Sequence, residues 1–560
     1  MDLDEIKETD VWNMYEKSVE FMHRRGIYSD TDLNNRMYNG DQWHGLKIEG
    51  VEKIQHNFIK QIVKQKVSTI TSNSFAVNYS PENIETTEFM ETAQKACDLL
   101  NKKASKVWDK DFMDKKIKKW AKQSAINDES ICYVTYDMTG DMPVNEIISK
   151  NDIMYGNENE DEIQLQPYIL IRQRKTILEL KELAKNNNVD KNLIDTLVGD
   201  NDVSTIAGDK GKDELEDKCW LITKFYRENG TIHYQQATRY IDFGKPKDME
   251  ISLYPIAHYN WEDQEGDARG VGEVRQLIPN QLETNKTAMR RAITTKNISY
   301  PQRVMNVDKI VNPQDANRVG ATIKFRDMGN VRAGDVFMLT TPGQMGTDSE
   351  KLQNELITLS KELSNAGDAT TGNINPESAS GRAILAVQNA QNQPLNDQVI
   401  GLKSFIEDIA RIWFEMWKVY AIDGLTIETE QVNPETGETE VTMNRIPDYI
   451  LDALDASVKV DITPKGAYDK YAQELSLENM FVSGKITFEE YVESLDADSV
   501  MPKVKLLNIM KKRQEAQKQI SELESQALMM KQNAQLNMQN SNEIENIAVQ
   551  GNQMIDQALA

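Results

Sequence analysis

The spacing of apolar residues divides the first half of the chain into two kinds of segment. Apolar side chains recur every three or four residues over 10–40, from about Asn57 onward, and from about 84 to 126, which predicts three helices. The spacing then changes to two, and this alternation predicts strands at 131–136 and 166–173. We therefore expect the first 260 residues to form an α+β domain.

Capping and turn residues support this division. Thr176 and Glu179 have the spacing of a capping box, which predicts the start of a short helix. The turn Glu228-Asn229-Gly230 lies between the alternating segments 220–227 and 231–240, and it predicts a β-hairpin. Residues 199–216 are polar and mostly acidic, and they predict a flexible insertion.

The second half of the chain begins with helical spacing. It predicts a helix over 272–298, short strands and turns over 302–346, and a helix over 348–365. Residues 367–381 are small and polar and predict a loop, after which a helix is expected over 382–420. That last helix carries apolar residues at alternating spacings of four and three. They are Leu395, Val399, Leu402, Ile406, Ile409, Trp413, Met416 and Tyr420.

Such a repeat is typical of a helix that packs in a core or against a neighbouring helix. Strand-like segments follow at about 425–461, and helical patterns cover 463–495 and a stretch from about Pro502 into the 530s. The last residues, from about 531, are rich in Gln, Asn and Met. They are compatible with a helix or with a disordered tail that only a neighbour orders.

Charge narrows the possible functions. The 560-residue chain has a net charge of −24, and such a chain repels the phosphate backbone of nucleic acids on average. Two interpretations remain: a protein with no nucleic-acid role, or a passage through which DNA slides without adhering. A lysine run at Lys115, Lys116, Lys118 and Lys119 indicates a solvent-exposed helix face.

Cysteine usage and the N-terminal sequence bear on the compartment. The three cysteines have no CxxC spacing, which indicates a reducing environment. The first ten residues are acidic and lack the basic and apolar regions of a signal peptide. No stretch approaches the roughly 20 apolar residues that a membrane span needs. We expect a protein with no membrane contact that is made in a cytoplasm.

Motifs for phosphate or metal chemistry do not occur in the sequence. Residues 208–213 contain a Gly-Lys step, but the spacing differs from a Walker A motif and Asp213 replaces the Mg²⁺-binding hydroxyl residue. HExxH, paired CxxC and EF-hand patterns are absent, and the five histidines are scattered. We therefore predict no enzymatic activity, no catalytic or metal-binding residue and no cofactor. A triad assembled only in three dimensions stays open.

Six short motifs occur along the chain. They are Tyr38-Asn39-Gly40-Asp41-Gln42-Trp43, Tyr254-Pro255-Ile256-Ala257-His258-Tyr259, Gly270-Val271-Gly272-Glu273-Val274, Leu277 to Asn285, Ser380-Gly381-Arg382-Ala383-Ile384, and Phe481 to Thr487 with Glu490-Tyr491. In order and spacing, this set resembles the portal proteins of tailed bacteriophages, which connect the head to the tail. The resemblance spans about 38–510.

The resemblance implies a non-enzymatic dodecameric ring at one vertex of the virion capsid, made in the cytoplasm of the bacterial host. Such a ring is the channel for DNA packaging and DNA ejection. The implied partners are further copies of the chain, double-stranded DNA, the large terminase that drives packaging, the major capsid and scaffold proteins, and head-tail adaptors.

The same resemblance implies a mostly helical α+β fold with wing, stem, clip and crown parts. Their bounds are 1–270 for the wing, 271–299 for the first stem helix, 300–347 for the clip, 348–366 for the second stem helix, 367–381 for the channel loop, 382–461 for a long radial helix with wing strands, 462–530 for a helical crown, and 531–560 for the tail. The predicted order of helix, strands, helix, loop and helix agrees with this arrangement independently.

Three groups of side chains are the candidate functional residues. In the channel loop, small polar side chains are expected to form weak, exchangeable contacts with a moving phosphate backbone; they are Asp368, Thr370, Thr371, Asn373, Asn375 and Ser378. The first stem helix has a local basic excess in Arg275, Lys286, Arg290, Arg291 and Lys296. The clip offers Lys324, Arg326 and Arg332 to the terminase and later to an adaptor.

Each group has a simpler interpretation. The loop at 367–381 is also compatible with an ordinary surface loop between two helices. The basic residues of the stem helix face DNA, the capsid, or acidic residues of a neighbouring subunit. For the whole chain, a helical scaffold or adaptor without DNA passage is the main alternative, and an unrecognised hydrolase is a third.

Overall fold

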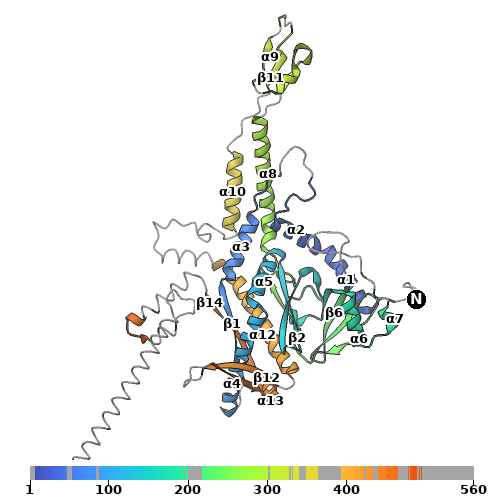
Figure 1. Cartoon of the computed structure of the whole chain (residues 1–560), viewed down its shortest axis with the longest axis vertical. Helices are drawn as coiled ribbons and strands as arrows, with labels where there is room; N and C mark the ends of the chain where they lie inside the picture. Colours follow the sequence, from blue (N-terminus) through green and yellow to red (C-terminus); the bar gives the residue numbers. More distant parts are fainter. Residues whose placement is uncertain are drawn as a thin grey trace, which may run out of the picture. The chain divides into compact units, whose positions relative to one another are not determined.

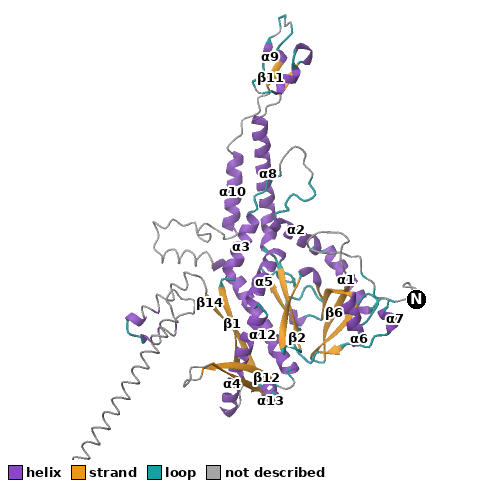
Figure 2. Cartoon of the chain, in the orientation of Figure 1, coloured by secondary structure: helices purple, strands orange, loops and turns teal. Residues whose placement is uncertain are grey.

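The fold mixes α-helices and β-strands, as the α+β class requires (Figures 1 and 2). The computed structural model describes residues 7–46, 53–82, 87–195, 197, 199, 217–299, 303–318, 320–326, 329–330, 332–339, 348–363, 393–421, 424–432, 439–464, 477, 480–488, 491 and 494. The chain divides into two compact units, Met1–Thr463 and Pro464–Ala560.

Two helices open the first unit. α1 (Asp10–Arg24) and α2 (Ile27–Asn39) replace the single helix predicted over 10–40. The break lies at Gly26, whose φ of +74° is a left-handed conformation that glycine adopts without a steric penalty. The prediction of helix was therefore correct, and the prediction of one uninterrupted helix was wrong.

The next helix begins where the sequence pattern placed it. α3 (Phe58–Ile70) starts after Asn57, whose side chain accepts a hydrogen bond from the Lys60 amide over 3.1 Å. β1 (Asn73–Pro81) follows, and the sequence analysis had not predicted this strand. β1 pairs with β14 (Ala456–Pro464), so this sheet joins two segments that lie far apart in the sequence.

The long helix predicted over 84–126 is also divided. α4 (Thr87–Lys110) and α5 (Met113–Asn127) meet at Phe112, which has a φ of +52°. The chain turns there, so that both helices place apolar side chains in the largest core.

A three-stranded sheet packs against these helices. Its order is β3-β2-β9, with β2 (Glu129–Asp137) antiparallel to both β3 (Met142–Ile148) and β9 (Ile256–Asn260). The strand predicted at 131–136 lies within β2, which confirms the change of period at that point.

A five-stranded antiparallel sheet forms the second layer of strands. Its members, in spatial order, are β4 (Ile153–Tyr155), β5 (Tyr168–Thr176), β6 (Lys218–Glu228), β7 (Thr231–Ala237) and β8 (Lys247–Asp248). The predicted hairpin is confirmed, because Glu228 pairs with Thr231 across a turn in which Asn229 and Gly230 both have positive φ.

The capping box is also confirmed. α6 (Ile177–Asn186) begins after Thr176, whose hydroxyl accepts from the Glu179 amide while the Glu179 carboxylate accepts from the Thr176 amide. The short helix α7 (Lys191–Ile194) follows.

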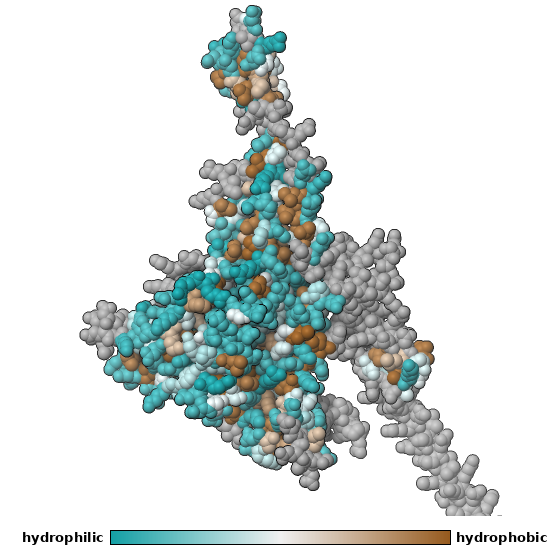
Figure 3. All heavy atoms as spheres, turned by 180° about the vertical axis from the view of Figure 1, so that it is seen from behind, coloured by the Kyte–Doolittle hydropathy of each residue, from teal (hydrophilic) through white to brown (hydrophobic). Residues whose placement is uncertain are grey.

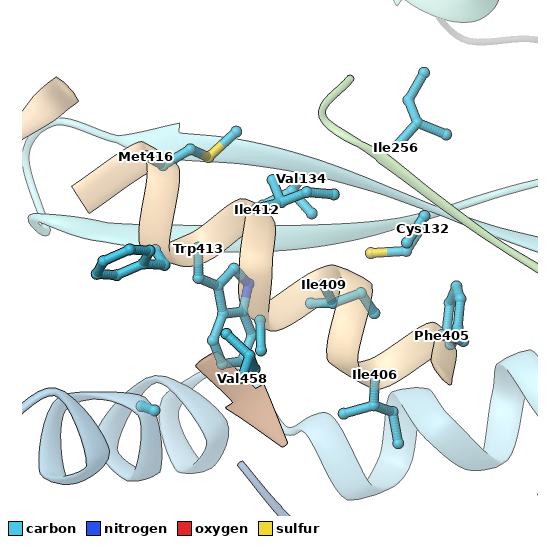
Figure 4. Close-up of a cluster of buried hydrophobic side chains, with 14 of the residues drawn as sticks. Cys132, Val134, Ile256, Phe405, Ile406, Ile409, Ile412, Trp413, Met416 and Val458 are labelled. Carbon is cyan, nitrogen blue, oxygen red and sulfur yellow. The ribbon is translucent and has the colours of Figure 1, made fainter. Parts of the chain in front are cut away.

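α12 (Asn396–Tyr420) runs through the middle of the largest core. Most members of its predicted repeat are buried: Leu402, Ile406, Ile409, Trp413 and Met416. Figure 4 shows Ile406, Ile409, Trp413 and Met416 near residues of β2 such as Cys132 and Val134. The Trp413 indole donates to Asn145 Oδ1 over 3.0 Å, so its polar atom is also paired inside the core.

Two helices and a small strand segment between them follow the order predicted for stem and clip. α8 (Glu273–Ser299) packs against α10 (Asp348–Leu363). Between them in the sequence lie β10 (Arg303–Met305), α9 (Ala333–Val336) and β11 (Phe337–Leu339), and β10 pairs antiparallel with β11.

The remaining described elements of the first unit are short. They are the hairpin of β12 (Leu425–Val432) and β13 (Thr439–Ile446), helix α13 (Asp448–Ala453), and 3₁₀ turns η2 (Lys150–Asp152), η3 (Ile163–Leu165), η4 (Val307–Lys309), η5 (Pro313–Asn317) and η6 (Gln393–Leu395). The strands predicted at about 425–461 are thus confirmed.

In the second unit, the described residues centre on one aromatic contact. The Phe481 ring lies 5.3 Å from Tyr491 and 5.7 Å from Phe488 between ring centroids. Gly484 makes the turn between them with a φ of +70°. The predicted crown (462–530) lies mostly outside the described residues, and the tail (531–560) lies wholly outside them.

Candidate functional site

The first residue of α8 is held by buried charges. The Glu273 carboxylate, fully buried, accepts from Lys66 Nζ of α3 over 2.7 Å and from the Trp261 indole over 3.4 Å. The Gly272 amide donates to Asp128 Oδ1 over 2.7 Å. Two carboxylates therefore lie at the N-terminal end of α8, where the helix dipole favours negative charge.

A second buried network lies next to this helix start. Arg269 pairs with Glu129, and its Nε donates to Glu158 over 3.1 Å. His258 Nε2 lies 2.8 Å from the other Glu129 oxygen. Arg269 also donates to the Ile153 carbonyl over 3.1 Å, so one guanidinium connects β2, β4 and the segment that leads into α8.

Electrostatics keep this network ionised. Burial alone would raise the pKa of Glu129, but Arg269, and after it His258, outweigh burial and lower that pKa to about 2. Burial opposes the charge of Arg269 as well, yet Glu129 and Glu158 raise the Arg269 pKa above its usual value. The charges are buried together, which is far less costly than burying either one alone.

Two further pairs extend the network. Lys150 Nζ donates to Asp128 Oδ2 over 2.5 Å, and both side chains are buried. Arg25, at the end of α1, pairs with Asp267 over 2.5 Å. The N-terminal helices, both sheets and the start of α8 are thereby joined through charged side chains.

Polar residues further along α8 bind the N-terminal segment. Asn285 Nδ2 donates to Gln42 Oε1, 243 positions earlier in the sequence, and Asn285 Oδ1 accepts from the His56 amide over 3.0 Å. Gln281 Oε1 accepts from the Phe58 amide over 3.1 Å, at the first residue of α3. Asn285 and Gln281 are fully buried, so these contacts are internal.

Two of the six motifs quoted above form the start and the middle of α8, one contacts this helix through Gln42, and one reaches only the network beside it through His258. Gln42 belongs to the first motif, His258 to the second, Gly272 to the third, and Gln281 and Asn285 to the fourth. The sequence analysis ordered these motifs along the chain but gave no sign that they lie together.

The predicted basic residues of α8 have acidic partners within the chain. Arg290 Nη1 lies 2.9 Å from Glu283, and Lys286 Nζ lies 3.7 Å from the same carboxylate. Arg275 pairs with Asp30 of α2 over 3.3 Å. All three basic side chains are about half exposed or more, so these pairs contribute little to stability and leave positive charge at the surface.

The other two predicted basic residues lie further along α8. Arg291 donates to Gln353 of α10 over 2.9 Å and lies 3.7 Å from Glu350, which ties the two helices together. Lys296 lies in the last turn of α8, where a cation complements the helix dipole. The five candidates thus do not form one cluster.

The predicted clip residues are exposed. Lys324, Arg326 and Arg332 lie at the surface, and the first two are placed by main-chain hydrogen bonds to the segment 309–312. The same segment, between α8 and α10 in the sequence, also exposes apolar side chains: Val304, Val307, Val311, Met338 and Leu339. Figure 3 shows hydrophobic and hydrophilic residues side by side on this part of the surface. Mixed apolar and basic surfaces are typical of protein docking sites.

The channel-loop prediction cannot be compared with the structure in the same way. Asp368, Thr370, Thr371, Asn373, Asn375 and Ser378 lie outside the described residues. Across the described parts of the chain, no set of three or more His, Cys, Asp or Glu is arranged to hold a metal ion. The helices described contain none with the length and apolarity to cross a bilayer.

Neither a protein-family model nor a curated protein matches this chain.

Sequence analysis missed the buried network. His258 was one of five scattered histidines without a predicted role, and neither Arg269 nor Glu129 was singled out. Arg269 directly precedes the Gly270–Val274 motif, but a single arginine in a sequence does not indicate which distant carboxylate it pairs with.

Proposed function

We propose that the chain is a portal protein, the ring-forming DNA channel at one vertex of a phage capsid. One observation carries the proposal: Gln42 of the motif at 38–43 is bound by Asn285 of the motif at 277–285, which lies 243 positions further along the chain. Motifs that serve one purpose are expected to share one location, whereas chance matches would be scattered.

The order of elements agrees with the proposal. α8 and α10 pack together as a pair of stem helices would, and the segment between them contains a small antiparallel pair of strands, as a clip would. A helical scaffold or adaptor has no need of this insertion.

The charge distribution suits a channel for a moving polyanion. The chain is acidic overall, and three exposed basic residues of α8, Arg275, Lys286 and Arg290, each lie close to a carboxylate. Fully free lysines and arginines would release counterions and hold DNA tightly, in a strongly salt-dependent way. Partly neutralised ones give weak contacts that exchange as the duplex advances.

The assembly state is the first test. Mass photometry and negative-stain imaging of the full chain should show a ring with a central hole and a mass about twelve times that of the 63.9 kDa chain. A monomer or dimer at all protein and salt concentrations contradicts the proposal, and a filled assembly favours the helical scaffold.

The channel loop needs a separate test. Deletion of residues 369–378 should leave the ring intact and reduce DNA packaging or retention in assembled heads. If packaging and retention equal those of the unmodified protein, residues 367–381 form a surface loop and not a channel element.

A further inference from the structure

Two adjoining helices carry a lysine surface in this acidic protein. α3 and α5 together contain eight lysines and a single acidic residue, Asp114. Two of the lysines are used internally: Lys66 binds Glu273, and Lys116 binds Asp111. The other six are half-buried or exposed and are here called the lysine face: Lys60, Lys64, Lys115, Lys118, Lys119 and Lys122.

The lysine face is continuous across the two helices. Lys115, Lys118, Lys119 and Lys122 follow one another at the spacing of one helix face. Lys122 of α5 and Lys60 of α3 both lie over the ring of Tyr38, at 5.0 and 5.8 Å from its centroid. Within the part of the chain that the structure describes, none of the six is within ion-pairing distance of a carboxylate.

The same unit has a hollow with the opposite charge. A cavity of about 450 Å³ lies between β9, the start of η3 and the first half of α12. Five carboxylates line it, and its lining includes neither lysine nor arginine; we call it the acidic cavity. The carboxylates are Asp161, Glu162, Asp263, Asp397 and Asp408.

We propose that the lysine face of one copy docks against the acidic cavity of a second copy. The inference rests on the proposed ring. The two surfaces share no residue and come from different elements, so the contact is heterologous, which is the type of contact that builds a ring when the rotation between copies closes. Lysine has a long, flexible side chain that can enter a hollow and place its ammonium group among carboxylates.

Charge complementarity favours a second copy over DNA as the partner of the lysine face. A phosphate backbone would satisfy the lysines but would be repelled by the acidic cavity, in which Asp408 pairs with Arg411 of the same chain and the other carboxylates would gain nothing. A second copy brings both charged surfaces into one favourable contact. The charges also disfavour incorrect pairings, because two acidic cavities repel each other and two lysine faces repel each other.

Charge reversal tests the contact in the full-length protein. Lys118→Glu with Lys119→Glu should raise the protein concentration needed for half-assembly at least tenfold. Adding Asp161→Lys and Glu162→Lys to that variant should restore assembly. Lys185→Glu with Lys191→Glu makes the same charge change at exposed sites of α6 and α7, and it should leave assembly unchanged.

Cross-linking tests the contact without any substitution. A zero-length carbodiimide reagent is applied to rings assembled from equal amounts of ¹⁵N-labelled and unlabelled chains. Peptides that join a lysine of the face in one isotope to a carboxylate of the cavity in the other support the contact, because such links must connect two copies.

The possible failures are distinguishable. If the unmodified chain forms no ring, the proposed function fails. If rings form normally, the reversed variant assembles as well as its control and no such mixed-isotope peptide is found, only the present inference is overturned. It is also overturned if the reversed variant forms rings but loses binding to a double-stranded DNA fragment, since the lysine face then binds phosphate.

Discussion

Asn285 of α8 donates a hydrogen bond to Gln42, and both side chains are buried. Gln42 precedes α3 and Asn285 lies in the middle of α8, so the bond fixes the N-terminal segment against the proposed stem helix. Buried amides are costly to leave unpaired, and each member of this pair therefore depends on the other.

That dependence is measurable as a coupling energy. Asn285→Ala is expected to lower the free energy of unfolding by about 1–3 kcal/mol, because it leaves the Gln42 Oε1 acceptor and the His56 N–H donor without a partner. Gln42→Ala should cost less when Asn285 is already Ala. Urea unfolding of both single variants and the double variant should give a coupling of about 0.5–3 kcal/mol, and simple additivity would contradict the pairing.

Gly272 is expected to tolerate no side chain. A Cβ at this position would lie 2.9 Å from the Asp128 nitrogen and 3.1 Å from the Ala125 carbonyl oxygen, and both are main-chain atoms that cannot rotate away. Gly272→Ala should destabilise the protein by about 1–3 kcal/mol in urea. Gly334→Ala is the control, since a Cβ there meets no atom within 4 Å, and its effect should be close to zero.

Glu129→Gln is expected to be among the most damaging single substitutions in the first unit. It keeps the shape of the side chain but removes one of the two carboxylates that pair with the buried Arg269, leaving Glu158, and this should cost about 3 kcal/mol. Glu283→Gln is the matched control, because its partners Lys286 and Arg290 are exposed, and it should cost less than about 1 kcal/mol. Equal thermal midpoints for the two variants would show that the buried network contributes no more to stability than the exposed ion pairs of Glu283.

Acid should weaken the protein through the same carboxylate. The pKa of Glu129 is about 2 in the folded protein, below the value of about 4.3 that an unfolded chain gives to glutamate. A lowered pKa stabilises the fold above about pH 4.3, and this contribution is lost as the pH falls from there towards 2. Urea unfolding across that range should show a smaller loss of stability for Glu129→Gln than for the unmodified chain.

Trp413 should carry much of the stability of the largest core. It is fully buried in α12, contacts Trp417 and donates to Asn145, so Trp413→Ala should cost about 3–5 kcal/mol. Ile400→Ala, in the same helix but about half exposed, should change stability by no more than about 0.5 kcal/mol. Comparable losses in the two variants would mean that α12 is not packed as described.

Features that depend on neighbouring residues were predictable from the sequence. The capping box of Thr176 and Glu179 and the turn at Asn229-Gly230 are local, because all their atoms come from a few consecutive residues. The buried repeat of α12 was predictable for a related reason: helical spacing alone determines which side chains share a face. These signals gave the α+β class and most element positions.

Features that depend on tertiary contacts were not predictable. Phe112 adopts a left-handed conformation with no glycine to mark it, and the chain turns there so that α4 and α5 share a core. The pairing of β1 with β14 needs knowledge of both segments at once. Arg269 and Glu129 are 140 positions apart, and charged residues at such a distance reveal nothing of their pairing in a single sequence.

The contacts that anchor α8 also limit where the chain can be truncated. A recombinant fragment that ends at residue 270 would contain all the strands described before α8. It would lack Glu273, which pairs with Lys66, and Gly272, whose amide donates to Asp128. Such a fragment would leave the buried Lys66 ammonium group without its carboxylate and would expose the surface that the start of α8 covers. Replacing α8 with a helix from another protein would likewise require compatible residues in several distant segments. We therefore expect α8 and the segments that contact it to be exchanged together, not separately, between related proteins.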